Sequence, residues 1–84
     1  MFEYLFTFRS LTAAQSARNV LSAEGIRAPV TRTPGRMAEN GCGYAVRVSD
    51  KSGIRAVNLL RRKQTGFVHA YRLFPNGRAE EVRL

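Results

Sequence analysis

The first segment of the chain alternates in hydrophobic character with a period of two residues. Its aromatic residues are Phe2, Tyr4, Phe6 and Phe8. A period of two is typical of a β-strand, in which successive side chains point to opposite faces of a sheet. Because Leu5 and Thr7 occupy the other face, the pattern predicts a central and mostly buried strand over residues 2–8.

A helical pattern follows this strand. Ser10 is a residue type that often caps a helix, because its hydroxyl accepts a hydrogen bond from an otherwise unsatisfied backbone N–H. Residues 11–24 are therefore expected to form a helix, which Gly25 ends. The apolar residues of this segment fall on one stripe: Ala13, Ala14, Ala17, Val20 and Leu21.

The middle of the chain predicts two more strands and a second helix. The strand expected over residues 26–33 contains Pro29, which cannot donate to a neighbouring strand and so indicates a sheet edge. A further strand is expected over residues 44–49, and a helix over residues 51–64 with Asp50 or Ser49 as its cap. The predicted buried stripe of this helix is Ile54, Ala56, Val57 and Leu60.

The last part of the chain predicts a β-hairpin. A strand is expected over residues 67–74, and Pro75-Asn76-Gly77-Arg78 is a strong turn signal. Residues 79–84 are expected to return as a short fifth strand.

The order strand, helix, strand, strand, helix, strand predicts an α+β fold. We expect a ferredoxin-like βαββαβ sandwich, with two helices on one face of an antiparallel sheet and an extra C-terminal strand. At 84 residues, the chain is expected to form a single domain, residues 1–84. The other sheet face is then wet or covered by a second subunit, and a homodimer is predicted if Tyr4, Phe67 and Tyr71 face that way.

Composition narrows the choice of function classes. The formal charge is +8 and comes mostly from arginine, which indicates either an anionic partner or solvated charges scattered over the surface. A single cysteine excludes an internal disulfide framework and a cysteine-rich zinc site. A free thiol fits a reducing cytosol, and the chain shows no apolar run long enough to cross a membrane and no secretory signal pattern at its start. We therefore expect a cytoplasmic protein. No bound metal or cofactor is expected.

The stretch Asn40-Gly41-Cys42-Gly43-Tyr44 holds this cysteine. Glycine on both sides permits backbone conformations that a side chain would forbid, so the pattern favours an exposed thiol on a loop tip. The alternative is that Cys42 is a small buried hydrophobic residue within ordinary turn chemistry.

The expected topology adds a second argument about Cys42. If the first and third strands are antiparallel neighbours, Arg9 and Ser10 lie near the segment from Gly41 to Gly43. The N-terminus of the first helix, with its unpaired N–H groups, starts at the same edge. Together with Arg32 and Arg36, these groups are expected to favour the thiolate, which is the reactive form of cysteine.

A set of residues spread along the chain carries a family resemblance: Tyr4, Phe6, Phe8, Glu24-Gly25-Ile26, Pro34-Gly35-Arg36, Cys42-Gly43 and Ala45-Val46-Arg47-Val48. Together they resemble the family of selenium/sulfur carrier-like proteins. The resemblance covers roughly residues 3–73 and implies that Cys42 carries a persulfide or selenium between donor and acceptor proteins. The chain departs from the family pattern by inserting Gly35 between proline and arginine and by having Glu39-Asn40-Gly41 before the cysteine.

Two other functions fit the sequence. A basic single-stranded nucleic-acid-binding domain of the RNA-recognition type shares the strand order, although Val46 and Val48 stand where such domains place stacking aromatics. A dimeric regulatory or scaffolding module would need no chemistry at Cys42. A stand-alone enzyme is disfavoured, because the chain has no second cysteine, no histidine beside Cys42 and no glycine-rich phosphate loop.

Overall fold

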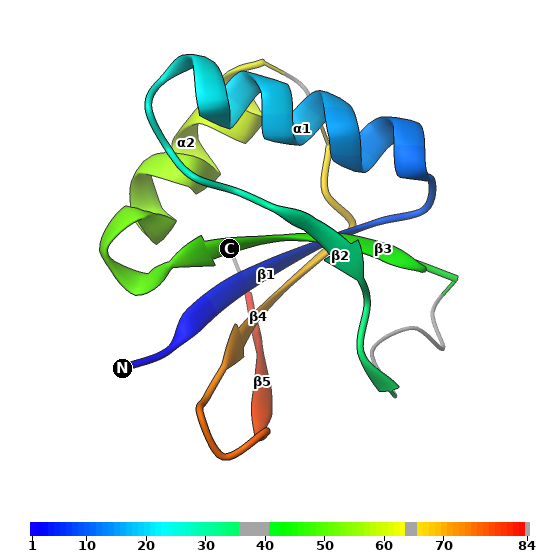
Figure 1. Cartoon of the computed structure of the whole chain (residues 1–84), viewed down its shortest axis with the longest axis vertical. Helices are drawn as coiled ribbons and strands as arrows, with labels where there is room; N and C mark the ends of the chain where they lie inside the picture. Colours follow the sequence, from blue (N-terminus) through cyan, green and yellow to red (C-terminus); the bar gives the residue numbers. More distant parts are fainter. Residues whose placement is uncertain (36–40, 64–65, 84) are drawn as a thin grey trace.

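The computed structural model of the chain describes residues 1–35, 41–63 and 66–83. They form an α+β domain with two α-helices and a five-stranded antiparallel sheet (Figure 1). The elements in chain order are β1 (Glu3–Phe8), α1 (Leu11–Ala23), β2 (Val30–Arg32), β3 (Tyr44–Ser49), the short 3₁₀ helix η2 (Asp50–Ser52), α2 (Gly53–Arg62), β4 (His69–Leu73) and β5 (Ala79–Val82).

The sheet has the strand order β2-β3-β1-β4-β5, and every neighbouring pair is antiparallel. β1 is the central strand: it pairs with β3 from Glu3↔Ser49 to Phe8↔Tyr44 and with β4 on its other side. The prediction that the first strand is central and beside the third is therefore confirmed. β2 lies at an edge, as Pro29 indicated, but it is shorter than predicted.

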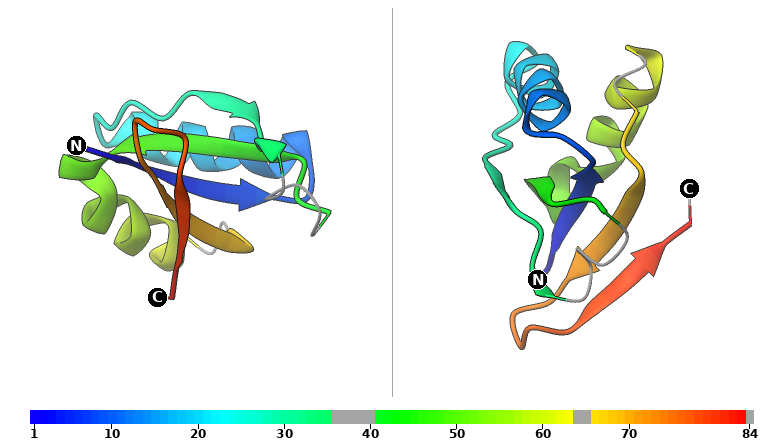
Figure 2. Two further views of the ribbon diagram at one scale, coloured as in Figure 1. Left: turned by 90° about the horizontal axis from the view of Figure 1, so that it is seen from below. Right: turned by 90° about the vertical axis from the view of Figure 1, so that its right-hand side faces the viewer.

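Both helices cover the same face of the sheet (Figure 2). The main core lies between them and the sheet, and on β1 it contains Tyr4, Phe6 and Phe8. Leu5, Ala45 and Tyr71 form a smaller buried cluster. Every residue of β1 from Tyr4 to Phe8 is buried, which is why both alternating sets of that strand are apolar or hydroxyl-bearing.

Two aromatics lie where the sequence analysis did not expect them. Tyr4 belongs to the main core, and its ring is 5.3 Å from that of Phe2 and 6.2 Å from that of Phe6. Phe67 packs against the same core, 5.1 Å from Phe6. The idea that Tyr4 and Phe67 face away from the helices is wrong, so two of the three aromatics behind the homodimer prediction are already used inside one chain.

Helix α1 follows its predicted pattern closely. Ala14, Ala17 and Leu21 are buried, and Gly25 has φ +78°, a left-handed conformation that glycine adopts without steric cost. At the other end, the Ser10 hydroxyl accepts a hydrogen bond of 3.1 Å from the backbone N–H of Ala13. Ser10 is therefore the N-cap that the sequence predicts.

Replacing this cap gives a first testable expectation. Ser10→Ala leaves the Ala13 N–H without its side-chain acceptor and should lower the free energy of unfolding by about 1 kcal/mol. Urea denaturation followed by circular dichroism measures the change. Ser16→Ala, on an exposed position of the same helix, is the control and should be close to neutral; equal loss in both variants would mean that the Ser10 hydroxyl contributes nothing as a cap.

Helix α2 begins later than predicted. Residues Asp50–Ser52 form a separate 3₁₀ turn, and neither Ser49 nor Ser52 makes a side-chain cap hydrogen bond. The predicted cap by Asp50 or Ser49 is therefore wrong for α2, which starts at Gly53. Ala56, Val57 and Leu60 are buried as expected.

Ile54 differs from the prediction for a geometric reason. It is 65% exposed, whereas the sequence pattern predicts it in the buried stripe of the second helix. Gly53, not Ile54, faces the sheet, and one further residue turns a helix by about 100°. That step carries Ile54 away from the face that Ala56, Val57 and Leu60 share.

The C-terminal hairpin forms as the turn signal predicts. Gly77 has φ +86°, its N–H donates to the carbonyl of Phe74, and the Phe74 N–H donates to the carbonyl of Arg78. β5 then pairs with β4 from Leu73↔Ala79 to Ala70↔Val82.

Among the described residues, no helix has the length and apolar character needed to cross a membrane.

Candidate functional site around Cys42

Cys42 lies just before β3, and its side chain has no exposed surface. Gly41 before it has φ +80°, so one of the two flanking glycines does adopt a conformation that favours glycine. The expectation of an open thiol on a loop tip is wrong. The backbone is shaped as the glycines suggested, but the sulfur lies inside the protein.

The strand pairing brings Cys42 to the same end of the sheet as the start of α1. The last β1–β3 pair is Phe8↔Tyr44, the α1 cap Ser10 lies two residues beyond Phe8, and Cys42 lies two residues before Tyr44. The segment after β1 and the segment before β3 therefore lie at the same end of the sheet. The neighbourhood predicted from the antiparallel arrangement of these strands follows from the observed register.

The residues predicted to favour the thiolate have separate roles in the structure. The Ser10 hydroxyl caps α1, and Arg9 is exposed. The Gly43 carbonyl accepts a 3.0 Å hydrogen bond from the Thr33 N–H. Arg36 lies outside the described residues. Their electrostatic influence on Cys42, like that of Gly41, stays a prediction.

Arg32 and His69 are placed by their own strands. The Arg32 guanidinium lies over the Tyr44 ring, 5.9 Å from its centroid, which is a cation–π arrangement. His69 is on β4, and its Nδ1 lies 3.0 Å from a carboxylate oxygen of Glu81 on β5. In the sheet, β1 lies between β4 and β3, the strand that follows Cys42.

Thr33 is a residue that the sequence analysis did not single out. Its side chain is 7% exposed, and its hydroxyl oxygen is buried without a hydrogen-bond partner among the described residues. Buried hydroxyls are usually satisfied, so this one is unusual. A threonine near the end of an edge strand is common, and nothing in the sequence alone distinguishes this position.

Comparison with known protein families shows the family to which the chain belongs. A family model described as "Putative Se/S carrier protein-like" matches residues 3–72. The chain belongs to this family. The matched region contains Cys42 and the elements from β1 to α2, while β5 lies beyond it. Searches of curated proteins and of solved structures found no significant match.

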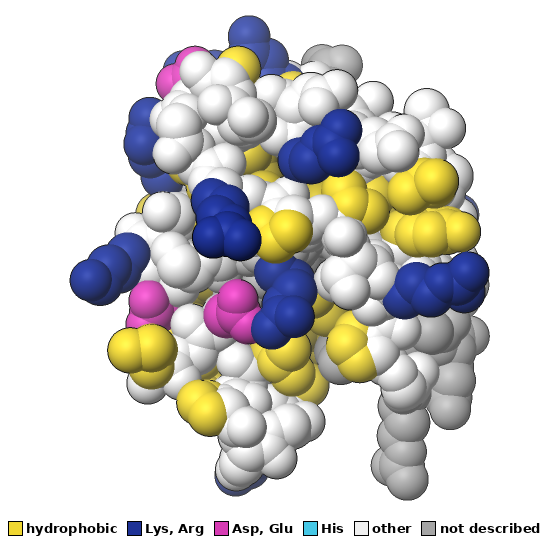
Figure 3. Space-filling model, viewed as in Figure 1, with side chains coloured by type: hydrophobic (Ala, Val, Ile, Leu, Met, Phe, Trp, Pro, Cys, Tyr) yellow, Lys and Arg dark blue, Asp and Glu magenta, His cyan; other side chains and the backbone are white. Residues whose placement is uncertain are grey.

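This family member lacks the stacking surface of an RNA-recognition domain on β1 and β3. Phe6 and Phe8 are buried in the main core, at 0% and 1% exposure. The alternating residues of the same strand, Leu5 and Thr7, are not aromatic and are buried as well. Lysine and arginine side chains are spread over the face seen in Figure 3 and do not form one stripe. Base stacking on these two strands is therefore not available as a mechanism, and the charge alone does not specify nucleic acid.

Metal chemistry has no support among the residues that the structure describes. No three histidine, cysteine, aspartate or glutamate side chains within those ranges come together as a group that would hold an ion.

Proposed function

We propose that this protein carries sulfur or selenium between proteins and that Cys42 is the residue that holds the transferred atom. Membership of the family of Se/S carrier-like proteins is the observation that carries the proposal. Cys42 is the only cysteine in 84 residues, so a covalent carrier that uses a thiol has one residue on which to do it. Donor and acceptor proteins are the implied partners.

The transfer chemistry is a thiol–persulfide exchange. The Cys42 thiolate attacks the outer sulfur of a persulfide on the donor protein; a new S–S bond forms at Cys42, and the donor's S–S bond breaks. The donor leaves as a thiolate, so no external oxidant or reductant is consumed. The acceptor repeats the same step and returns Cys42 to its thiolate form. The protein is then a carrier and not an enzyme.

Burial of the sulfur sets a condition on this chemistry. To react, the Cys42 thiolate must come into direct contact with the donor sulfur. The Cys42 side chain has no exposed surface, so the donor sulfur cannot reach it in the closed structure. We therefore include in the proposal that the segment holding Cys42 opens locally when a donor docks. Such opening keeps the loaded sulfur away from unrelated thiols until a partner is present.

The arrangement of strands and helices around Cys42 is compatible with the proposed carrier role. We propose that β1 to β4 with the two helices form a ferredoxin-like core, to which β5 is an addition. In such a fold the start of α1 and the segment before β3 lie at the same end of the sheet. The N–H groups of α1 and the Arg9 guanidinium would then favour the anionic form of the sulfur once it is uncovered.

Transfer of labelled sulfur tests the proposal. A cysteine desulfurase loaded with ³⁵S-labelled cysteine is mixed with the protein, which is then separated without reductant. The wild-type chain should retain label that dithiothreitol releases, and Cys42→Ala should retain none. Ser16→Ala, which keeps the cysteine and changes an exposed serine of α1, is the matched control and should label as wild type does. Equal label on wild type and Cys42→Ala would refute the role of Cys42.

A further inference from the structure

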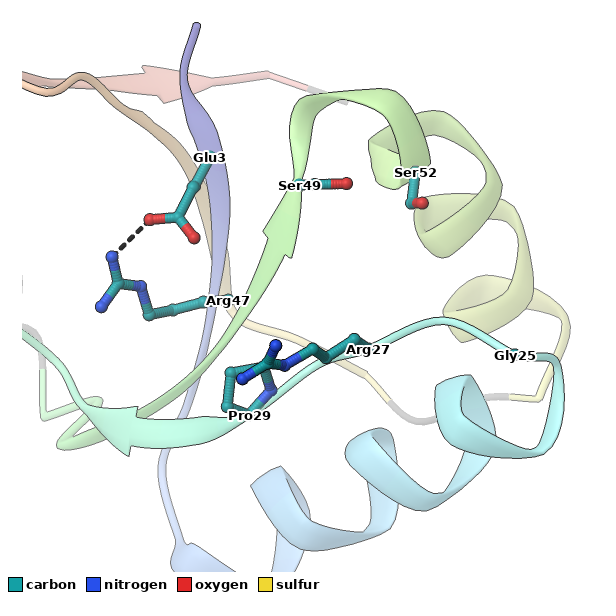
Figure 4. A pocket seen from close by; sticks show the side chains of 7 residues that line it. All are labelled: Glu3, Gly25, Arg27, Pro29, Arg47, Ser49 and Ser52. Atoms are coloured by element: carbon teal, nitrogen blue, oxygen red, sulfur yellow. Dashed lines mark hydrogen bonds and ion pairs between the residues drawn. The ribbon is translucent and has the colours of Figure 1, made fainter.

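A cavity of about 620 Å³ lies at the other end of β3, away from Cys42. It is lined by the start of β1, the end of β3, the segment between α1 and β2, and the end of η2 (Figure 4). Its polar side chains are Glu3, Arg27, Arg47, Ser49 and Ser52. A volume of this size is within the range of small-ligand sites.

The charges in this cavity are not balanced. Glu3 is paired with Arg47, whose Nη2 donates to a Glu3 carboxylate oxygen. Arg27 forms no ion pair or hydrogen bond with the residues that the structure describes. Arg47 also keeps a buried Nε–H without an acceptor in that same part of the chain. The cavity is therefore lined by one unpaired guanidinium, that of Arg27, and by a second arginine with one buried donor that no described residue satisfies.

Two serine hydroxyls add donors on the opposite side of the cavity from Glu3 and Arg47 (Figure 4). Ser49 is the N-cap of η2 and Ser52 is the N-cap of α2, yet neither makes a side-chain cap hydrogen bond. A serine at such a position ordinarily satisfies a backbone N–H with its oxygen. Here both hydroxyls remain available to a ligand.

We propose that this cavity binds the phosphate group of a small organic molecule. Arginine and hydroxyl groups are the side chains that most often donate to phosphate oxygens. Phosphate offers more oxygens than a carboxylate does, which fits a cavity lined by donors from β3, the α1–β2 segment and η2. The one carboxylate present, on Glu3, is satisfied by a single arginine. The volume leaves room for the organic group attached to the phosphate.

The site is independent of the carrier role of Cys42. It uses none of the residues predicted around the sulfur, and it lies at the Ser49 end of β3 while Cys42 precedes Tyr44. A carrier without a phosphate site and a phosphate site without a carrier role are both testable outcomes.

Nuclear magnetic resonance titrations at constant ionic strength test the proposal. Inorganic phosphate, adenosine monophosphate and acetate are each added to the ¹⁵N-labelled chain. Phosphate and adenosine monophosphate should give saturable shifts of the Gly25, Ser49 and Ser52 amides, the nucleotide more tightly, and acetate should bind more weakly than either. Arg27→Gln should weaken phosphate binding by about tenfold, as expected for losing a charged hydrogen-bonding group.

Arg61→Gln provides the matched control. It removes the same charge from an exposed position in the last turn of α2, so a general counter-ion effect would be equal in both variants. The control should change affinity by less than about twofold. Equal losses in the two variants, shifts that do not saturate, or acetate binding as tightly as phosphate would overturn the proposal. Labelling of Cys42 with sulfur in Arg27→Gln keeps this result separate from the carrier function.

Discussion

Replacing Gly53 with alanine is expected to destabilise the protein by about 2 kcal/mol, despite the better helix propensity of alanine. A Cβ atom on Gly53 would lie 2.0 Å and 2.1 Å from two ring carbons of Tyr4. Tyr4, on the central strand, packs against the rings of Phe2 and Phe6, so its side chain has little space into which it could move. Overpacking of this kind costs about 1–3 kcal/mol and more where relaxation is blocked.

The backbone of Gly53 makes this a clean test of packing. Its φ of −59° and ψ of −49° are ordinary helical values that alanine adopts without strain. Gly43→Ala is the control, because a Cβ there meets no atom within 4 Å. Urea denaturation of both variants, and of Gly53→Ala in a Tyr4→Leu background, measures the effect. A Gly53→Ala variant as stable as wild type, or one not rescued by the smaller residue 4, would contradict the close approach of α2 to β1.

Alkylation of Cys42 in the folded protein is expected to be at least about 100-fold slower than in the unfolded chain. The side chain has no exposed surface, so iodoacetamide reaches it only through an opening. An opening that costs about 3 kcal/mol or more lowers the reactive population by two powers of ten. Mass spectrometry at timed intervals, with and without urea, gives both rates.

An exposed thiol in the same fold calibrates this measurement. Ser16→Cys in a Cys42→Ser background places the new thiol on an exposed position of α1, and it should react at nearly the same rate with and without urea. If Cys42 in the folded chain reacts as fast as this reference thiol, it is not buried in solution. If a desulfurase raises the alkylation rate of Cys42 but not that of the reference thiol, the opening on docking that the proposed carrier role requires is supported.

Local sequence signals predicted the elements well where one physical cause dominated. The Ser10 cap, the Gly25 terminator, the turn at Asn76-Gly77 and the bounds of β3 all agree with the structure. In each case the determining interaction lies within a few residues of the signal. The central position of β1 was also predictable, because a strand with apolar residues on both faces needs cover on both sides.

Errors arose where the answer depends on distant parts of the chain. Glycines around Cys42 report the local backbone, but whether the sulfur is covered depends on how segments pack over it. Tyr4 and Leu5 are both apolar, so the pattern does not say which set faces the helices. The phase of α2 is set by the contact of Gly53 with Tyr4, a pair separated by 49 positions in the sequence, and that contact turned Ile54 outward.

The two edge strands of the sheet bear on how the proposed carrier would meet its partners. β2 contributes only Val30–Arg32 and is preceded by Pro29, and β5 contributes only Ala79–Val82, with adjacent glutamates at positions 80 and 81. Short, charged or proline-flanked borders are poor templates for a visiting strand. We therefore expect the proposed donor and acceptor proteins to engage this protein through side chains and connecting segments, and not by adding a strand to its sheet.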